Sequence, residues 1–433
     1  MRLAAPFERS KSRLMTSKEK ILAALSHEPG PVPIDFGSNA VTGMHCSVVE
    51  SLRDYYGLEK HPVFINEPYQ MLGEVEDDLR EAIGIDTDAI YPRNTIFGFD
   101  LSGEKEWRTP WGQNVRVPAG FVTKKDENGD ELIYPKGDTS VPPSGRMPTN
   151  GYFFDTIIRQ EPVDDDNLNV EDNLEEFTPL EDADLDYLAG EVERLKDSTR
   201  GVMANFGGTG LGDIALVPGP FLTHPKGIRD ITEWYVSTVA RPEYVHEIFA
   251  RQTKIAIANL ERIHTVVGDT VHAMFLCGTD FGTQDSTFCS PDTFRELYLP
   301  YYRQMTDWIH SNTNWKVFKH SCGAVANFMP LFIEAGMDII NPVQISAKGM
   351  DPVQLKKSFG DHLVFWGGGV DTQKTMAFGS PDEVKAEVEK SCRVFGEHGG
   401  FVFNAVHNVQ AKSAVENVVA MIDAVAQFNR AGS

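Results

Sequence analysis

The sequence has no long apolar run, no excess of basic residues and few cysteines. Its 433 residues contain no stretch of about 18 apolar residues, which excludes a transmembrane helix. Lys and Arg total 40 against 63 Asp and Glu, and the net charge of −23 argues against nucleic acid or an anionic membrane as a partner. A cytoplasmic protein is expected, because charged residues follow Pro6 where a secretory signal needs an apolar stretch.

Several common motifs are absent as well. An odd number of widely spaced cysteines predicts free thiols and not a disulfide framework. The glycine-rich stretch 206–210 lacks the Lys-Ser/Thr of a P-loop, and there is no Gly-x-Ser-x-Gly elbow. These absences exclude the common nucleotide-binding and serine-hydrolase arrangements. The five cysteines are Cys46, Cys277, Cys289, Cys322 and Cys392.

Short apolar runs alternate with helical patterns along most of the chain. Such alternation favours a parallel sheet made of βα units, and about eight strands fit a (β/α)₈ TIM barrel. A doubly wound open sheet is the alternative, but no Gly-x-Gly-x-x-Gly turn follows the first strand. The expected strands lie near residue 34 and at 86–91, 202–206, 271–276, 315–320, 338–341, 363–366 and 401–404.

Three segments depart from this rhythm. Residues 1–14 are expected to form a flexible extension ahead of a barrel that spans 15–433, with a helix capped by Thr16. Residues 101–160 predict a small β-rich insertion after the second strand, with a hairpin turn at 126–130. The acidic stretch 164–186 is interpreted as a solvated loop without a function.

The clearest candidates for chemistry follow the fifth and eighth strands. In a barrel enzyme the catalytic residues lie just after the carboxyl ends of the strands. His320 and Cys322 are two residues apart and can converge on one point, and His407 follows the eighth strand at the same face. Imidazole and thiolate are ligands that zinc prefers, and three ligands with an open position are typical of a catalytic site. The alternative is a buried thiol beside hydrogen-bonded histidines.

Other polar residues are expected at the same face. Asp280 could orient a ligand, complete the metal shell, bind substrate or only cap its loop, and Gln344 is a second candidate for catalysis. Many amides and few carboxylates favour a neutral or amphipathic ligand over a glycosidase substrate. His45 and Cys46 are a rival ligand pair. The expected substrate-binding residues are Asn39, Phe206, Gln284, Asn341, Gln373 and Asn404.

These motifs together resemble the uroporphyrinogen decarboxylase superfamily, in particular its zinc-dependent, corrinoid-linked methyltransferases. The resemblance extends from about Met15 to the C-terminus. It is carried by 18–25 with 33–37, His320-Ser321-Cys322-Gly323, Asn341-Pro342-Val343-Gln344, Trp366-Gly367-Gly368 and Glu416-Asn417-Val418.

The resemblance implies a (β/α)₈ barrel that binds zinc through His320, Cys322 and a later cysteine. His407 occupies the position of that cysteine, and histidine is also a suitable zinc ligand. The true decarboxylases carry an arginine-rich loop after the first strand, whereas 36–43 contains no arginine. A polycarboxylate porphyrinogen would therefore find little counter-charge there.

We therefore expect a methyltransferase that moves a methyl group from a small methylated compound, in particular a methoxylated one, to a corrinoid protein. The expected cofactors are zinc and a cobamide carried by that partner. A metal-free decarboxylase that uses Asp86 or Asp88, and a non-catalytic ligand-binding barrel, are the alternatives. The sequence leaves open the methyl donor, the direction of transfer and the oligomeric state, including a homodimer.

Overall fold

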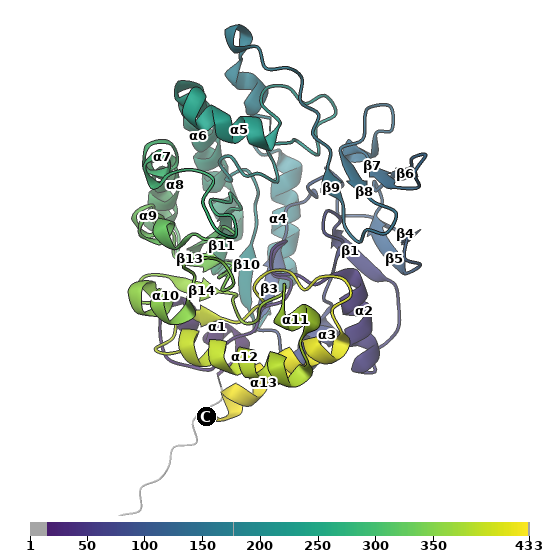
Figure 1. Cartoon of the computed structure of the whole chain (residues 1–433), viewed down its shortest axis with the longest axis vertical. Helices are drawn as coiled ribbons and strands as arrows, with labels where there is room; N and C mark the ends of the chain where they lie inside the picture. The colour runs from purple at the N-terminus through teal and green to yellow at the C-terminus, as the bar shows by residue number, and fades with distance from the viewer. Residues whose placement is uncertain (1–14, 176, 432–433) are drawn as a thin grey trace, which may run out of the picture.

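A curled parallel sheet forms the centre of the molecule. The computed structural model describes residues 15–175 and 177–431, so the predicted extension 1–14 lies outside the described residues (Figure 1). Seven strands pair in parallel, and their order in the sheet follows their order in the chain. The other short strands, which belong to two smaller sheets, are not part of this order. In spatial order they are β15 (Phe401–Val402), β14 (Val364–Trp366), β13 (Ile339–Asn341), β12 (Lys316–His320), β11 (Ala273–Cys277), β10 (Gly201–Ala204) and β3 (Thr87–Ile90).

The strand expected near residue 34 is reduced to a single bridge between Ile34 and Phe403. Backbone bonds run from Asp35 N to Phe403 O (2.9 Å) and from Phe403 N to Pro33 O (2.8 Å). On the other side, Asp86 N donates to Ile34 O at 2.8 Å. The segment 33–35 therefore connects the regions of β15 and β3 and takes the place of an eighth strand.

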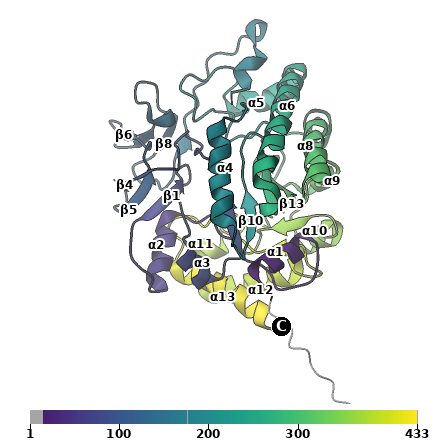
Figure 2. The same ribbon diagram turned by 180° about the vertical axis from the view of Figure 1, so that it is seen from behind.

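Helices follow the strands and cover the outer face of the sheet. In Figure 2, α4, α6 and α8 lie side by side on that face. The helices are α1 (Ser17–Leu25), α2 (Cys46–Tyr55), α3 (Asp77–Ile83), α4 (Asp182–Leu195), α5 (Ile231–Ala240), α6 (Pro242–Val267), α7 (Pro291–Thr293), α8 (Leu299–Asn312), α9 (Met329–Glu334), α10 (Pro352–Phe359), α11 (Thr375–Phe378), α12 (Pro381–Phe395) and α13 (Val415–Ala431). None of the helices in the described ranges is both long and apolar enough to cross a bilayer.

The core has two layers because successive strand residues point to opposite faces. Phe318 packs inside the curled sheet with side chains of the other strands, and Ile21, Ala24 and Leu25 of α1 close the amino-terminal end of this inner cluster. Val317, one residue earlier, belongs to the larger layer between the sheet and the helices. The predicted capping box of α1 is present, with Thr16 accepting from Glu19 N.

Six short strands lie between β3 and α4 in the chain, and with β1 and β2 they form two four-stranded sheets in which every pair is antiparallel except β1–β5, which is parallel. One sheet has the order β2-β1-β5-β4 and the other β6-β7-β8-β9. The predicted hairpin is present, with β6 and β7 pairing on either side of the turn. The strands are β1 (Val63–Glu67), β2 (Leu72–Gly73), β4 (Glu104–Arg108), β5 (Asn114–Pro118), β6 (Thr123–Lys125), β7 (Glu131–Ile133), β8 (Gly145–Met147) and β9 (Asp155–Thr156).

Residues 164–186 were expected to form a solvated loop, and most of the described ones are exposed, but α4 begins at Asp182 and ion pairs tie the stretch 164–182, here called the acidic strap, to neighbouring helices. Its carboxylates pair with arginines on or near α5 and α6, which hold it along these helices. Composition alone could not identify these partners, because the arginines lie 54 to 80 residues later in the chain. The pairs are Arg241–Asp165, Arg251–Glu171, Arg229–Glu175 and Arg262–Asp182.

Candidate metal centre

The three predicted metal ligands converge at the carboxyl ends of β12 and β15. One ligand atom from each of His320, Cys322 and His407 lies within 4.8 Å of the others. Cys322 Sγ is 3.4 Å from His320 Nε2, and the two imidazole ring centroids are 5.4 Å apart. This is the single group of three such residues found in 15–175 and 177–431.

A neighbouring amide fixes the protonation and orientation of His320. His320 Nδ1 lies 2.6 Å from Asn341 Oδ1, and Asn341 Nδ2 donates to Trp366 O at 2.8 Å. Because Oδ1 can only accept, Nδ1 must carry the proton and Nε2 presents its lone pair toward Cys322. Burial lowers the pKa of His320 to about 3, so the ring is neutral at physiological pH. An orienting partner of this kind is typical of metal-bound histidines.

Cys322 is held in a tight loop by Asp280. The Cys322 N–H donates to Asp280 Oδ1 at 2.6 Å, while Tyr235 OH donates to the Asp280 carbonyl at 2.7 Å. At Gly323 φ is +89°, and a Cβ there would lie 2.3 Å from the Gly282 carbonyl carbon, so only glycine fits. Burial, and then the negative charge of Asp280, raise the pKa of the Cys322 thiol. A cation is therefore needed to stabilise its thiolate.

His407 reaches the cluster from the loop after β15. Burial, and then the proximity of His320, lower its pKa to about 4. Its Nδ1 accepts the Asn408 backbone N–H at 2.8 Å, which places the proton of the neutral ring on Nε2. Binding a metal through either nitrogen would break this hydrogen bond. A metal at Nδ1 would use the lone pair that accepts the Asn408 N–H, and a metal at Nε2 would shift the ring proton to Nδ1, which could then no longer accept. His320 is thus better prepared for a metal than His407.

The donor set fits zinc. Two neutral imidazoles and one thiol supply nitrogen and sulfur ligands, and three protein ligands leave a fourth tetrahedral position for another molecule. His320 already has the tautomer and the orienting partner that ligation needs. The rival pair fits poorly: Cys46 is buried with its Sγ directed at Gln113 Oε1 (3.4 Å), and His45 Nε2 is bonded to Tyr152 O.

Two predicted site glutamines hold neighbouring loops together. Gln344 Oε1 accepts from Gly323 N at 2.7 Å, and its Nε2 donates to Gln284 Oε1 at 2.8 Å. Gln284 Nε2 in turn donates to Ser346 O at 2.7 Å. Both side chains are therefore engaged within the protein, and their direct effect is to support the loop that carries Cys322.

Some of the remaining predicted substrate-binding residues lie away from the metal cluster, and others lie in the loops beside it. Gln373 is exposed, and Phe206 packs against Trp315 in the layer between sheet and helices. Asn39 and Asn404 are 1% and 0% exposed and belong to the loop after residue 34 and the loop after β15. The consecutive glycines 367–369 pack against neighbouring loops, including backbone atoms of Ala405 and Asn404.

Sequence reasoning missed Lys319, which is fully buried beside the cluster. Its Nζ donates to Thr279 O at 2.5 Å and to His320 O, and it lies 5.1 Å from the ring centroid of Phe281. A buried ammonium is costly unless it is hydrogen-bonded, and these two carbonyls belong to the loops that carry Asp280 and Cys322. The signal was the alternation of the strand, because Lys319 falls on the same face as buried Val317.

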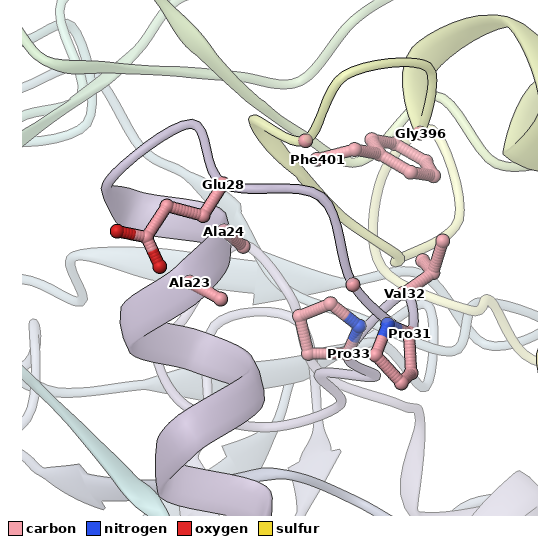
Figure 3. A pocket seen from close by; sticks show the side chains of 10 residues that line it. Ala23, Ala24, Glu28, Pro31, Val32, Pro33, Gly396 and Phe401 are labelled. Atoms are coloured by element: carbon pink, nitrogen blue, oxygen red, sulfur yellow. The ribbon is translucent and has the colours of Figure 1, made fainter. Parts of the chain in front are cut away.

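Two other hollows lie away from the cluster. Figure 3 shows a pocket of about 10 Å³ between the end of α1 and the start of β15, lined by Ala23, Val32 and Phe401 among others. That volume corresponds to about one water molecule. A larger groove of about 700 Å³ runs along α12 and is lined by residues such as Met350 and Lys390. Neither contains a residue of the cluster.

Comparison with known proteins places this geometry in a family. A family model for "Uroporphyrinogen decarboxylase (URO-D)" matches residues 156–428. The uroporphyrinogen decarboxylase of Pelodictyon phaeoclathratiforme is 26% identical over 192 residues, covering 42% of this chain and 52% of that protein. That of Chlorobium luteolum is 26% identical over 176 residues, covering 38% of this chain and 47% of that protein. The chain thus spans about half the length of these curated relatives.

A solved structure extends the comparison to the whole fold. A methyltransferase from Methanosarcina mazei superposes with a TM-score of 0.53 at 14% sequence identity, covering 96% of this chain and 99% of that one. The two proteins therefore share a fold that includes the region before residue 156. Because the family model covers more than half of the residues, from β9 to α13, the chain belongs to the uroporphyrinogen decarboxylase family.

Proposed function

We propose that the protein is a zinc-dependent methyltransferase that moves a methyl group from a small methoxylated compound to the cobalt of a separate corrinoid protein. The observation that carries the proposal is the convergence of His320, Cys322 and His407 at the carboxyl ends of β12 and β15. The fold shared with the methyltransferase from Methanosarcina mazei is consistent with it.

The chain's own residues prepare the site for this reaction. Asn341 keeps the Nε2 lone pair of His320 available, and Asp280 holds the loop that presents the Cys322 thiol. Zinc, when bound, would supply a Lewis acid that withdraws electrons from the oxygen carrying the methyl group. The chemistry that the partner would supply is a cobalt(I) nucleophile with the electron pair for the new bond to carbon, so the pair of the methyl–oxygen bond would stay on the oxygen.

Porphyrinogen decarboxylation is supported less well, although the curated relatives carry that name. Asp86, one candidate acid for that reaction, accepts from Lys20 Nζ and from Ile34 N, both at 2.9 Å. Asp88 is bonded to Arg80 at 2.7 Å and to Ser198. Both carboxylates therefore have structural partners, and the loop 36–43 lacks arginine.

The decisive experiment measures metal content and methyl transfer on the same preparation. Purified protein should hold about one zinc per chain, and with cob(I)alamin and 2-methoxyphenol it should convert the absorption spectrum to that of methylcobalamin. The His407→Ala variant should lose transfer. Metal-free protein that decarboxylates a porphyrinogen would establish the alternative, and zinc-loaded protein that transfers nothing from any methylated donor would indicate a binding barrel.

A further inference from the structure

Two buried amides beside the cluster each have one atom without a partner. Asn39 is 1% exposed and Asn404 0% exposed. Among the described residues, Asn39 Nδ2 and Asn404 Oδ1 have no hydrogen-bond partner. Most buried polar groups in folded proteins are hydrogen-bonded, because an unpaired one retains the full cost of leaving water. One unpaired donor and one unpaired acceptor in neighbouring loops therefore require an explanation.

The orientation of each amide is fixed by its other end. Asn404 Nδ2 donates to Asp35 O at 2.7 Å and to Thr42 O at 3.1 Å, so a flipped amide would set oxygen against two carbonyl oxygens. Asn39 Oδ1 accepts from Val41 N at 2.9 Å, so a flipped amide would set two donors against each other. The unpaired donor on Asn39 and the unpaired acceptor on Asn404 thus follow from the hydrogen-bond network.

Both amides belong to one pair of interlocked loops. Asn404 bonds to Thr42 O, and Thr42 N donates to Asn39 O at 3.3 Å. Asn408, four residues after Asn404, donates to Ala40 O at 2.9 Å in the same loop. His407 is in this segment, so the two unpaired atoms lie in the loops next to the metal cluster.

We propose that Asn39 and Asn404 form a neutral donor–acceptor subsite that binds a hydroxyl or primary amide group of the methyl-bearing substrate. The inference rests on the proposed function and names the substrate class of the same site. A hydroxyl or an amide both donates and accepts, so it satisfies both atoms. A carboxylate or a second ether accepts only, and would leave Asn404 Oδ1 facing another acceptor.

Four matched compounds test this assignment on zinc-loaded full-length protein. In titration calorimetry, 2-methoxyphenol and 2-methoxybenzamide should bind roughly tenfold more tightly than 1,2-dimethoxybenzene and 2-methoxybenzoate. Asn39→Ser removes the unpaired donor, while the serine hydroxyl can still accept from Val41 N. That variant should lose most of the preference. Asn128→Ser, at an exposed asparagine of the hairpin turn, should retain it.

The outcomes separate the subsite from the reaction. Equal binding of all four compounds, no binding of any, or an unchanged preference in Asn39→Ser would overturn the subsite, because an ordered water would then be the partner of both amides. A circular dichroism melt of each variant identifies a loss of folding, and Asn39→Asp, which retains the acceptor for Val41 N, gives a second reading of the preference. Selective binding without methyl transfer would overturn the methyltransferase function and leave the subsite established.

Discussion

Histidines lie near both ends of the sheet, but their surroundings differ. At the amino-terminal end, His310 Nε2 lies 2.8 Å from Asp338 Oδ2, and His272 Nδ1 accepts from Val202 N at 2.9 Å. At the carboxyl-terminal end, His320 and His407 converge with a thiol and form no ion pair with a carboxylate within the described ranges. The difference shows that convergence with other ligand side chains distinguishes a candidate metal site from a histidine with a structural role.

The largest effect should follow from removing the thiol of the cluster. We expect Cys322→Ala to lower zinc affinity at least about 100-fold, because one of three ligands is lost. The fold should persist, since the side chain lies in a loop at the strand end and is partly exposed. Elemental analysis after dialysis and competition with a zinc chelator give the affinity, and circular dichroism gives the folded fraction.

A cysteine away from the cluster provides the matched control. Cys289 lies just before α7 and is not a member of the group of three ligand residues, so it should not act as a ligand. Cys289→Ala should keep full zinc content. Full occupancy in Cys322→Ala, or metal loss in Cys289→Ala, would contradict the assignment of the centre.

An intermediate effect should follow from releasing His320 from its amide. Asn341→Ala removes the acceptor that fixes the Nδ1 proton, and loss of such an orienting partner typically costs about 10- to 100-fold in metal affinity. The same competition assay measures it. Asn312→Ala, at an exposed asparagine on α8, should have no effect on affinity. Equal affinity in both variants would mean that Asn341 does not prepare His320 for the metal and that its role is the hydrogen bond that it donates to Trp366 O.

The smallest effect concerns the histidine at the opposite end. The hydrogen bond to Asp338 raises the pKa of His310, although burial acts against it. Burial alone would raise the pKa of Asp338, but hydrogen bonds from His310 and Val317 N lower it below its usual value. The pair therefore stabilises the fold most between the unfolded-state pKa values of about 3.9 for Asp and 6.5 for His.

His310→Gln should accordingly lose about 0.5 kcal/mol of unfolding free energy near pH 5.5, a small value because the pair is partly exposed. The loss should shrink as pH rises through the folded pKa of His310, and also as acid protonates Asp338. Urea unfolding at pH 5.5 and pH 9 measures both values. A loss that is equal at the two pH values would show that packing, and not charge, is what the variant removes.

Most of the fold was predictable because strand and helix patterns are local. The seven paired strands lie within or overlap the expected ranges, and the hairpin at 126–130 follows from its turn residues. The segment near residue 34 was expected to be a strand, but its pairing is confined to a single bridge. The acidic strap is largely exposed, as its composition indicated, but its arginine partners could not be predicted because they lie far away in the sequence.

The candidate site was also predictable in part: the ligand residues could be predicted, but the roles of the amides around them could not. The strand-end rule brought His320, Cys322 and His407 together, and the structure has their ligand atoms close to one another. The rule could not separate amides that support the protein from those with a free atom, because hydrogen-bond partners depend on tertiary contacts. Asn341 and Gln344 are fully engaged, whereas Asn39 and Asn404 are not.

The segment 33–35 has a consequence for how the chain is made. It bonds to Phe403, and Val32 nearby exchanges two hydrogen bonds with the side chain of Asn429, 397 residues later. During synthesis, residues 32–35 leave the ribosome long before Phe403 and Asn429, their hydrogen-bond partners. We therefore expect the side of segment 33–35 that bonds to Phe403, and the face of α1 that contacts β15, to stay unpaired until β15 has emerged, which makes the nascent chain most dependent on chaperones in that interval.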